Sequence, residues 1–457
     1  MWLVAEGPMT ECVAQIALNF YEEKPVEVSF DAPEISSDGG AVLLRQIDDR
    51  LGVSRWFAAA LPDERDAVKV EHDRLEQVRQ RLYQIALGYE DCNDADTLRH
   101  DPLLRTVCDR PSGDRPGLSS QPTLSRFENA VGMRDLKSLL TAFEQRWVEA
   151  LAADTEVIVL DIDTTDDQTH GAQQLSFFHG YYDHHIYHPV LIFDGEGELV
   201  SAILRPGNTH AARGAGTVLE RVLRTVKARL PHVQVVVRGD AGFGIARIIE
   251  HLERLDHELG GIAYLFGVAK NPALLRVAAP ALAAAAARFA DTHIKVRDFV
   301  TARHAAQTWS RPRCMVVKAE HTAQGPNPRF VVTNLEGFEA RLLYDAYCHR
   351  GQCENLIKDL KNALKADRLS CSTFTANFFR LLLHGAAYRL MLALRRAARA
   401  VHSELGVQQF DTIRLRVLKV AAVVRHSVRR VLVQLPRAFP CAAIFRRLAE
   451  VTAAPAT

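Results

Sequence analysis

The stretch Val157-Ile158-Val159-Leu160-Asp161-Ile162-Asp163 decides the fold. A short β-branched, apolar run of this kind is typical of a buried strand, and here it ends in acidic residues. A second such run, 233–237, leads into Arg238-Gly239-Asp240. Ligands gather at the carboxyl ends of strands in α/β sheets. We therefore expect the carboxylates of Asp163 and Asp240 to meet at one sheet edge.

The neighbouring sequence predicts the rest of an α/β domain over residues 151–385. Alternating or apolar segments predict further strands, and apolar residues at helical spacing predict two helices between them. The expected strands are 174–186, 188–194, 198–204 and 263–268, and the expected helices are 214–230 and 245–255. Residues from about 270 to 338 form a β-rich insertion that begins with an Ala-rich helix, 281–290, opened by Pro280.

Two flanking regions differ from this core in pattern. Residues 1–150 are acidic and mainly helical, which suits a DNA-end-binding or dimerisation region, or plain scaffold. Residues 386–457 are basic and are also predicted to be helical. The predicted fold class is thus α/β, with a mixed-sheet core, a β-rich insertion and helical regions on both sides.

The charge of the chain is balanced overall but unevenly distributed. The 457 residues contain 56 Lys and Arg and 55 Asp and Glu, a net charge of +1, which argues against a histone-like polyanion binder. Residues 341–457, however, hold 20 Lys and Arg against 7 Asp and Glu. This asymmetry indicates a polyanion partner for one end of the chain, and solvated helix faces are the alternative explanation.

A late helix, predicted from 339 to about 366, supplies a third acidic residue in a row of cations. At about 100° per residue, Tyr347, Arg350, Glu354 and Lys361 fall on one face. Lys358 and Lys365 share that face. The carboxylate of Glu354 is therefore predicted to lie in a row of Lys and Arg side chains, with Tyr347 at the N-terminal end of that row.

Two strand-end aspartates and a helix-borne glutamate suit two-metal phosphoryl transfer. Mg²⁺ (or Mn²⁺) takes a few carboxylate oxygens and keeps positions open for phosphate and water. Two such ions can stabilise the attacking and leaving oxygens of an in-line displacement. Singly, each Asp is more often a cap or turn residue, and Glu354 is more often half of a surface ion pair. The prediction of a metal site therefore depends on the three acidic residues taken together.

The spacing Tyr347-x₂-Arg350-x₃-Glu354-x₆-Lys361 resembles the Tyr-Arg-Glu-Lys signature of bacterial insertion-sequence DDE transposases. Local stretches such as 37–40, 88–91 and 238–243 are similar to the subgroup numbered thirteen-eighty. The resemblance implies a ribonuclease H-like core, Mg²⁺-dependent cleavage at transposon ends and strand transfer into target DNA.

The resemblance also implies roles for individual residues. Asp163, Asp240 and Glu354 would be the catalytic metal ligands. Asp161 is an alternative first ligand, because side chains two positions apart on one strand point to the same face. The signature places Tyr347 and Arg350 near phosphates or a flipped end base, and Lys361 near terminal DNA. Lys358 and Lys365 join these as expected DNA contacts. The expected partners are terminal inverted repeats and target double-stranded DNA, bound by a homodimer.

Other interpretations stay open. A host repair or recombination nuclease of the same fold is one alternative, and a non-cutting DNA-binding protein derived from a transposase is another. The histidines 179, 184, 185 and 188 could hold zinc, although DNA contact is the better hypothesis. We expect a basic face on the N-terminal region around Arg74, Arg79, Arg81 and Arg99. Arginine pairs at 395–396, 429–430 and 446–447, on predicted helices, are candidate phosphate contacts.

Sequence features also bear on the compartment. None of the eight cysteines forms Cys-x-x-Cys, which disfavours a zinc ribbon or a thioredoxin motif. The N-terminus lacks the pattern of a signal peptide, and we find no apolar stretch long enough to span a bilayer. We expect a reduced, cytoplasmic protein associated with the bacterial nucleoid and with no membrane partner.

Overall fold

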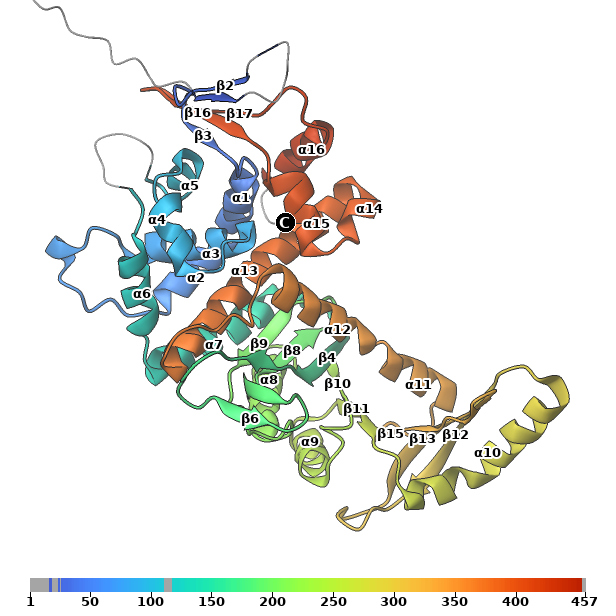
Figure 1. Cartoon of the computed structure of the whole chain (residues 1–457). Coiled ribbons are helices and arrows are strands. Elements are labelled where there is room, and N and C mark those ends of the chain that lie inside the picture. The colour runs from blue at the N-terminus through green and yellow to red at the C-terminus, as the bar shows by residue number, and fades with distance from the viewer. Residues whose placement is uncertain (1–15, 19–23, 25, 111–116, 454–457) are drawn as a thin grey trace, which may run out of the picture.

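A nine-stranded mixed sheet organises the chain, as seen in a computed structural model that describes residues 16–18, 24, 26–110 and 117–453 (Figure 1). The strand order is β12-β13-β15-β11-β10-β4-β8-β9, with β14 paired to β13. The strands are β4 (Val157–Thr164), β8 (Val190–Asp194), β9 (Leu199–Ile203), β10 (Gln234–Gly239), β11 (Ile262–Val268), β12 (Val296–His304), β13 (Arg313–Thr322), β14 (Gly325–Pro326) and β15 (Arg329–Thr333).

Strand β4 lies at the centre of this sheet. It pairs antiparallel with β8 and parallel with β10, which in turn pairs parallel with β11. The parallel register sets Arg238 beside Asp161 and Gly239 beside Ile162. The carboxyl ends of β4 and β10 therefore lie side by side, as the sequence predicts.

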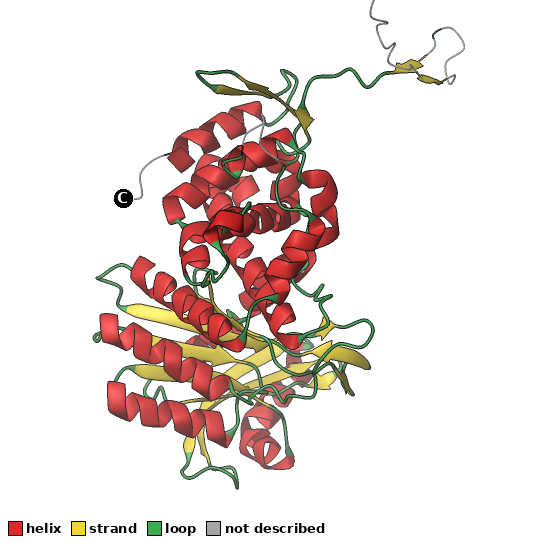
Figure 2. Cartoon of the chain, turned by 90° about the vertical axis from the view of Figure 1, so that its left-hand side faces the viewer, coloured by secondary structure: helices red, strands yellow, loops and turns green. Residues whose placement is uncertain are grey.

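Helices cover both faces of the sheet (Figure 2). On one face, α8 (Ala215–Arg229) and α9 (Ala246–Leu259) share an apolar core with the side chains of Leu160 and Ile162. On the other face, α7 (Met133–Ala150) and α13 (Phe374–Val401) pack on β9. The helices α8 and α9 come after β9 and β10 in the chain, so the core runs strand-strand-strand-helix-strand-helix-strand.

The segment 174–186 differs from the single sheet strand predicted for it. It forms a hairpin of β6 (Phe177–His179) and β7 (His184–Tyr187), which joins β5 (Asp167–Gln168) in a separate three-stranded sheet. The chain reverses at residues 180–183, where Asp183 adopts a φ of 60°. Asp tolerates that left-handed conformation better than most residues, so the reversal has a local cause.

The N-terminal region is a helical bundle wrapped around α13. Two short strands, β1 (Ile16–Leu18) and β2 (Val26–Val28), pair ahead of it, and residues 1–15 lie outside the described chain. Its further helices are α1 (Ala41–Leu51), α2 (Val53–Ala59), η1 (Ala67–Lys69), α3 (Arg74–Leu87), η2 (Cys92–Asp94), α4 (Ala95–Leu98), α5 (Pro102–Val107) and α6 (Gln121–Asn129).

The basic face expected on this bundle does not exist as predicted. Arg79 and Arg81 are buried, 5% and 0% exposed. Arg81 donates to Glu128 at 2.8 Å, and Arg79 pairs with Asp109. Helix α3 is buried on nearly all sides, so Arg79 and Arg81 pair with acidic residues of the bundle and do not face solvent.

The insertion forms an arm that projects from the sheet (Figure 1). Its helix α10 (Pro272–Thr292) packs on β12 and β13, and Pro280 lies within it, not at its start. Among the described residues, α10 is one helix that is long and apolar enough, by length and composition, to cross a membrane. This finding corrects the expectation that no apolar stretch is long enough to span a bilayer. The Ala run and few charges produce this property.

The C-terminal region is not wholly helical. Helix α13 runs unbroken through the expected boundary at residue 386 and is followed by α14 (Ser403–Gly406), α15 (Phe410–Ile413), η4 (Arg414–Leu418) and α16 (Ala442–Ala453). A hairpin of β16 (Ala422–His426) and β17 (Val431–Gln434) intervenes and pairs with β3 (Ile35–Ser36). Its alternating β-branched residues favour strands. The exposed Arg429 and Arg430 therefore lie at a hairpin turn, not on a helix.

Candidate active site

Asp163 and Asp240 lie next to each other at the carboxyl ends of two parallel strands. Asp240 comes directly after β10, whose last residue is paired one position before Asp163 on β4. Gly242 N–H donates to Asp240 Oδ1 at 2.9 Å and fixes the turn after the strand. Both aspartates are partly exposed, so their carboxylates are accessible at this edge.

The carboxyl group of Asp163 has an unusual proton affinity. Burial raises its pKa to about 6, and the charges of Asp240 and Glu354 act in the same direction. Arg350 and the backbone N–H of Thr164, which donates to Asp163 Oδ1 at 2.8 Å, oppose that shift. A carboxyl group whose pKa is raised by neighbouring acidic charges lies in a negative potential, which attracts a cation.

Asp161 occupies a different environment. It is 2% exposed, and both of its oxygens accept hydrogen bonds from Arg238, each at 2.7 Å. Arg238 also donates to the carbonyl oxygen of Ala346 at 2.7 Å. The pair thus joins β4 and β10 to the helix that carries Ala346, and each oxygen of Asp161 is engaged by Arg238.

The late helical segment is not the single helix that the sequence predicts. It divides into α11 (Ala340–Cys348), α12 (Gly351–Lys358) and a π-helical turn, η3 (Asp359–Ala363). A π-turn contains an extra residue and shifts the register of the residues after it. The face calculated at 100° per residue therefore does not hold through Lys361, although Arg350 and Lys361 both reach the end of β4.

Arg350 lies between the acidic residues. Its Nη1 donates to Asp163 Oδ2 at 2.9 Å, and its Nη2 is 3.6 Å from Glu354 Oε1. Burial lowers the pKa of the Arg350 guanidinium, but the surrounding acids outweigh it and the pKa is raised. The Glu354 side chain remains 59% exposed. One guanidinium therefore bridges the strand-borne and the helix-borne carboxylates.

Tyr347 rests against the neighbouring strand β11. A Cβ added to Gly267 on β11 would lie 2.6 Å from Tyr347 Oη and 3.2 Å from the backbone nitrogen of Ala241. Burial raises the pKa of the Tyr347 phenol, and Asp240 contributes to that direction. The absence of a side chain at Gly267 thus creates the space in which the phenol lies beside Asp240.

The three lysines of the predicted stripe have different positions. Lys361 donates to Thr165 Oγ1 at 3.1 Å and pairs with Asp166 at 3.1 Å, so it binds the loop after β4. Lys358 is exposed, and Lys365 is half-buried with a φ of 59°. Within the described ranges, neither of these two has a carboxylate within ion-pair distance.

The donor set fits a hard divalent cation in its chemistry. Asp163, Asp240 and Glu354 offer carboxylate oxygens, which Mg²⁺ and Mn²⁺ prefer. In the part of the chain that the structure describes, no three His, Cys, Asp or Glu side chains are close enough together to hold an ion, the histidines of the β6–β7 hairpin included. Arg350 supplies the positive charge between these carboxylates instead.

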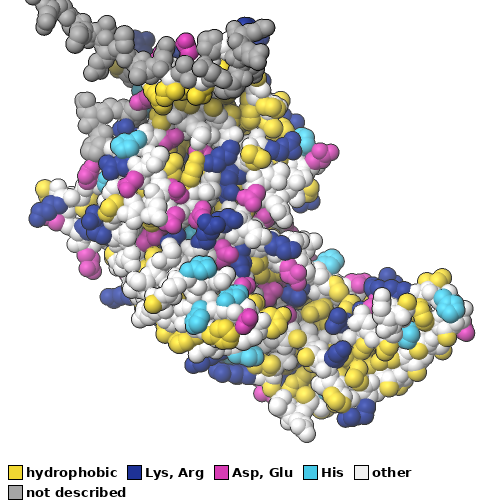
Figure 3. All heavy atoms as spheres, viewed as in Figure 1, with side chains coloured by type: hydrophobic (Ala, Val, Ile, Leu, Met, Phe, Trp, Pro, Cys, Tyr) yellow, Lys and Arg dark blue, Asp and Glu magenta, His cyan; other side chains and the backbone are white. Residues whose placement is uncertain are grey.

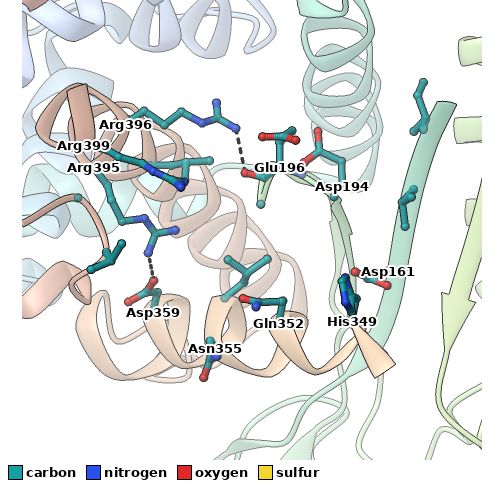
Figure 4. A pocket seen from close by; sticks show the side chains of 18 of the residues that line it. Asp161, Asp194, Glu196, His349, Gln352, Asn355, Asp359, Arg395, Arg396 and Arg399 are labelled. Atoms are coloured by element: carbon teal, nitrogen blue, oxygen red, sulfur yellow. Dashed lines mark hydrogen bonds and ion pairs between the residues drawn. The ribbon is translucent and has the colours of Figure 1, made fainter. Parts of the chain in front are cut away.

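A separate cleft of about 980 Å³ lies behind α12 (Figure 4). Its lining includes Gln352 and Asn355 of α12 and Arg399 of α13. Asp359 of η3 extends toward Arg395 and is paired with it, while Phe410 N–H donates to the other Asp359 oxygen at 3.2 Å. This buried contact attaches the π-turn to the C-terminal helices.

Several residues that build the site were not predicted from the sequence. They are Arg238, Asp166, Gly267 and Asp359, each of which holds a predicted residue or its helix in place. A charged residue inside an apolar strand signals a partner on the adjacent strand, so Arg238 could have been found. Gly267 and Asp359 depend on contacts between distant segments and carry no local signal.

Comparison with known proteins identifies the class. The family model "Transposase DDE domain group 1" matches residues 18–455. The chain therefore belongs to this family of DDE transposases. A search of curated proteins found no match. Among solved structures, the chain is similar to a piggyBac transposase synaptic complex with hairpin DNA, with 8% identity, a TM-score of 0.43, and coverage of 82% of this chain and 79% of that one.

Proposed function

We propose that the protein is a transposase that cleaves DNA at transposon ends and transfers the freed strand into target DNA. The observation that carries this proposal is the placement of Asp163 and Asp240 at adjacent strand ends, with Arg350 joining Asp163 to Glu354, in a chain of the DDE transposase family. The order of the core, three strands, helix, strand, helix and strand, supports a ribonuclease H-like fold. The bacterial insertion-sequence subgroup numbered thirteen-eighty is part of the same proposal.

Asp163, Asp240 and Glu354 would hold divalent metal, with Mg²⁺ as the preferred ion. Bound metal would polarise the scissile phosphate and lower the pKa of the attacking water. The chain's own residues position the substrate: Arg350 offers a planar fork to phosphate oxygens once metal neutralises the carboxylates, and Lys361 orders the loop after β4. Tyr347, beside Asp240, limits the space around the reacting phosphate.

The proposed partner is double-stranded DNA, carrying either the terminal inverted repeats or the target, bound by a homodimer. The exposed Lys358 adjoins the site on α12, and Arg429 and Arg430 are exposed on the β16–β17 turn. Arginine and lysine at such positions bind phosphates independently of sequence, with a strong dependence on salt. The bacterial cytoplasm is the proposed location.

Cleavage of a plasmid that carries the gene with its flanking DNA tests the proposal. We expect Mg²⁺-dependent breaks at the element ends with the wild-type protein and none with Asp240→Asn or Glu354→Gln. Asp345→Asn is the matched control, because Asp345 is an exposed carboxylate on the adjacent α11. Cleavage that survives in both site variants would overturn the metal-site assignment. Breaks without preference for the ends would favour a host nuclease, and end binding without breaks would favour a non-cutting DNA-binding protein.

A further inference from the structure

The C-terminal region contains a long segment without acidic residues. Residues 412–449 hold nine Lys and Arg and no Asp or Glu. Over much of the face in Figure 3, by contrast, Lys and Arg side chains are interspersed with Asp and Glu. Cations of one segment repel one another unless acids from elsewhere in the chain, or a polyanion, neutralise them. The position of each cation therefore shows which of them the protein itself neutralises.

The cations just before the β16–β17 hairpin are used inside the protein. Lys419 pairs with Asp38 at 2.7 Å. Arg414 donates to the carbonyl oxygens of Ala86 and Ala363 at 2.8 and 2.6 Å. These contacts attach the segment that leads into β16 to the helical regions of the chain. Their role is structural, and they are not available to a ligand.

The arginines of the hairpin itself are exposed. Arg425 lies on β16, and Arg429 and Arg430 lie at the turn, next to a fully exposed Val428. Within the residues that the structure describes, none of the three arginines has a carboxylate within ion-pair distance. Exposed guanidinium groups without acidic partners create a positive potential that attracts a polyanion.

The register of the hairpin gives it a packed face and an outward face. Val424 is 3% exposed and is paired with Val433, and both pack on the apolar core. Arg425 and its partner Leu432 are the next pair along, so they point to the opposite face. Gln434, two residues after Leu432, shares that face. The outward face therefore presents a guanidinium, an isobutyl group and a carboxamide.

The hairpin is held in shape at both ends. At the turn, Ser427 N–H donates to the carbonyl oxygen of Arg430 at 3.0 Å, and the Ser427 hydroxyl donates to the same oxygen at 2.9 Å. That hydroxyl also accepts from Arg430 N–H at 3.2 Å. At the other end, β16 pairs with β3. A hairpin that is ordered before binding loses little conformational entropy when a ligand arrives.

These features match the groove of duplex DNA. The major groove admits a two-stranded β-ribbon, and there Arg binds the edge of guanine while Gln binds the edge of adenine. Phosphates on both sides of the groove bind exposed cations whatever the sequence. Figure 1 places β16 and β17 at the end of the molecule away from the nine-stranded sheet. DNA bound by this hairpin is therefore reached at a distance from the candidate active site.

We propose that the β16–β17 hairpin enters the major groove of the duplex at the element end, with Arg425 and Gln434 at base edges and Arg429 and Arg430 at phosphates. The inference rests on the proposed function for the identity of that duplex. It assigns the reading of the end sequence to a β-ribbon of the C-terminal region, outside the acidic site and the Tyr-Arg-Glu-Lys signature. Sequence discrimination and cleavage then depend on separate residues.

Binding to duplex DNA in EDTA tests this without cleavage. One fluorescein-labelled probe carries the DNA that flanks the gene at one element end, and the other carries the same bases in scrambled order. We expect Arg425→Ala to reduce the preference for the end duplex about tenfold, the scale of one base contact with two parallel hydrogen bonds. Arg429→Gln and Arg430→Gln should each weaken both duplexes alike and lower the salt slope of log K by about one.

Methylation of guanine N7 tests the choice of groove, because N7 lies in the major groove. We expect methylation of particular guanines in the end duplex to interfere with binding of the wild type. The same methylation should not interfere with Arg425→Ala, which has already lost the contact. Interference at identical guanines in both proteins would overturn the assignment of Arg425.

Arg254→Gln is the matched control. The Arg254 side chain is 56% exposed on α9, but Glu220 and Glu258 lie within ion-pair distance of it. This variant should bind both duplexes as the wild type does. The inference is overturned if the wild type prefers the end duplex and the three hairpin variants keep its affinity, preference and salt dependence, or if the wild type binds neither duplex.

Cleavage of the element ends separates this inference from the proposed function. A wild type that reads the end duplex through the hairpin but never cuts it would retain the inference and contradict the proposed function. End-specific cleavage that is unchanged in Arg425→Ala, Arg429→Gln and Arg430→Gln would contradict the inference and retain the proposed function.

Discussion

The guanidinium of Arg350 donates a hydrogen bond to Asp163 at 2.9 Å across 187 residues of sequence. The same guanidinium approaches Glu354 one helical turn away. Without metal, carboxylates this close repel one another, and a fixed cation between them lowers that repulsion. Arg350 therefore joins the strand-borne Asp163 to the helix-borne Glu354.

Replacing Arg350 should damage catalysis more than folding. We expect Arg350→Gln to reduce single-turnover cleavage by about 10²-fold, the scale measured for loss of one charge-stabilising donor. Arg350→Lys should restore only part of the lost cleavage rate, because an ammonium cannot form the two parallel hydrogen bonds of a guanidinium. Rates are measured with metal at saturation. Full activity in Arg350→Lys would show that charge alone is required and would refute the forked contact.

Replacement by Asn should lower the stability of the fold at Asp161 but should lower only the cleavage activity at Asp163. Asp161→Asn breaks a buried pair and leaves Arg238 without its charge partner, which costs about 3–5 kcal/mol of the free energy of unfolding. Asp163→Asn should leave the fold intact and abolish cleavage. Urea unfolding of both variants, together with a cleavage assay, separates these outcomes. An Asp161→Asn protein that is stable but inactive would make Asp161 the metal ligand.

The raised pKa of Asp163 predicts a stability change with pH in the metal-free protein. The folded-state pKa of about 6 exceeds the ordinary 3.8, so the native state binds more protons between these values. Stability therefore falls as pH rises from about 4 to 6, by about 1–3 kcal/mol for this group. Thermal unfolding in EDTA should show this slope in the wild type, and Asp163→Asn should lack that part of it. Identical slopes in the two proteins would contradict the raised pKa.

The sequence predicts the strand ends that carry Asp163 and Asp240 because its signals there are local. The apolar runs that end at Asp163 and Asp240 determine strands, and adjacent parallel strands bring their carboxyl ends together regardless of the loops between them. The Tyr-Arg-Glu-Lys spacing is also a local signal, and it predicts that Glu354 lies on a helix. Subgroup, metal dependence and dimerisation remain predictions from resemblance.

Other features depend on long-range contacts that no short window contains. Helical periodicity gives no indication of the π-turn at 359–363, which is attached by Asp359 to Arg395 and Phe410. Counting charges could not show that Arg79 and Arg81 neutralise internal acids, because burial depends on the packing of α3 against other helices. The predicted basic face failed for this reason.

The contact between Gly267 and Tyr347 predicts a coupling measurable by a double-mutant cycle. Gly267→Ala places a methyl group 2.6 Å from Tyr347 Oη and should destabilise the fold by about 1–3 kcal/mol. In a Tyr347→Phe background the hydroxyl is absent, so the cost should fall by at least about 0.5 kcal/mol. Urea unfolding of the four proteins gives the coupling. Gly180→Ala, at a glycine with open space, is the control and should leave stability nearly unchanged. Equal costs in both backgrounds would mean that Tyr347 does not rest on Gly267.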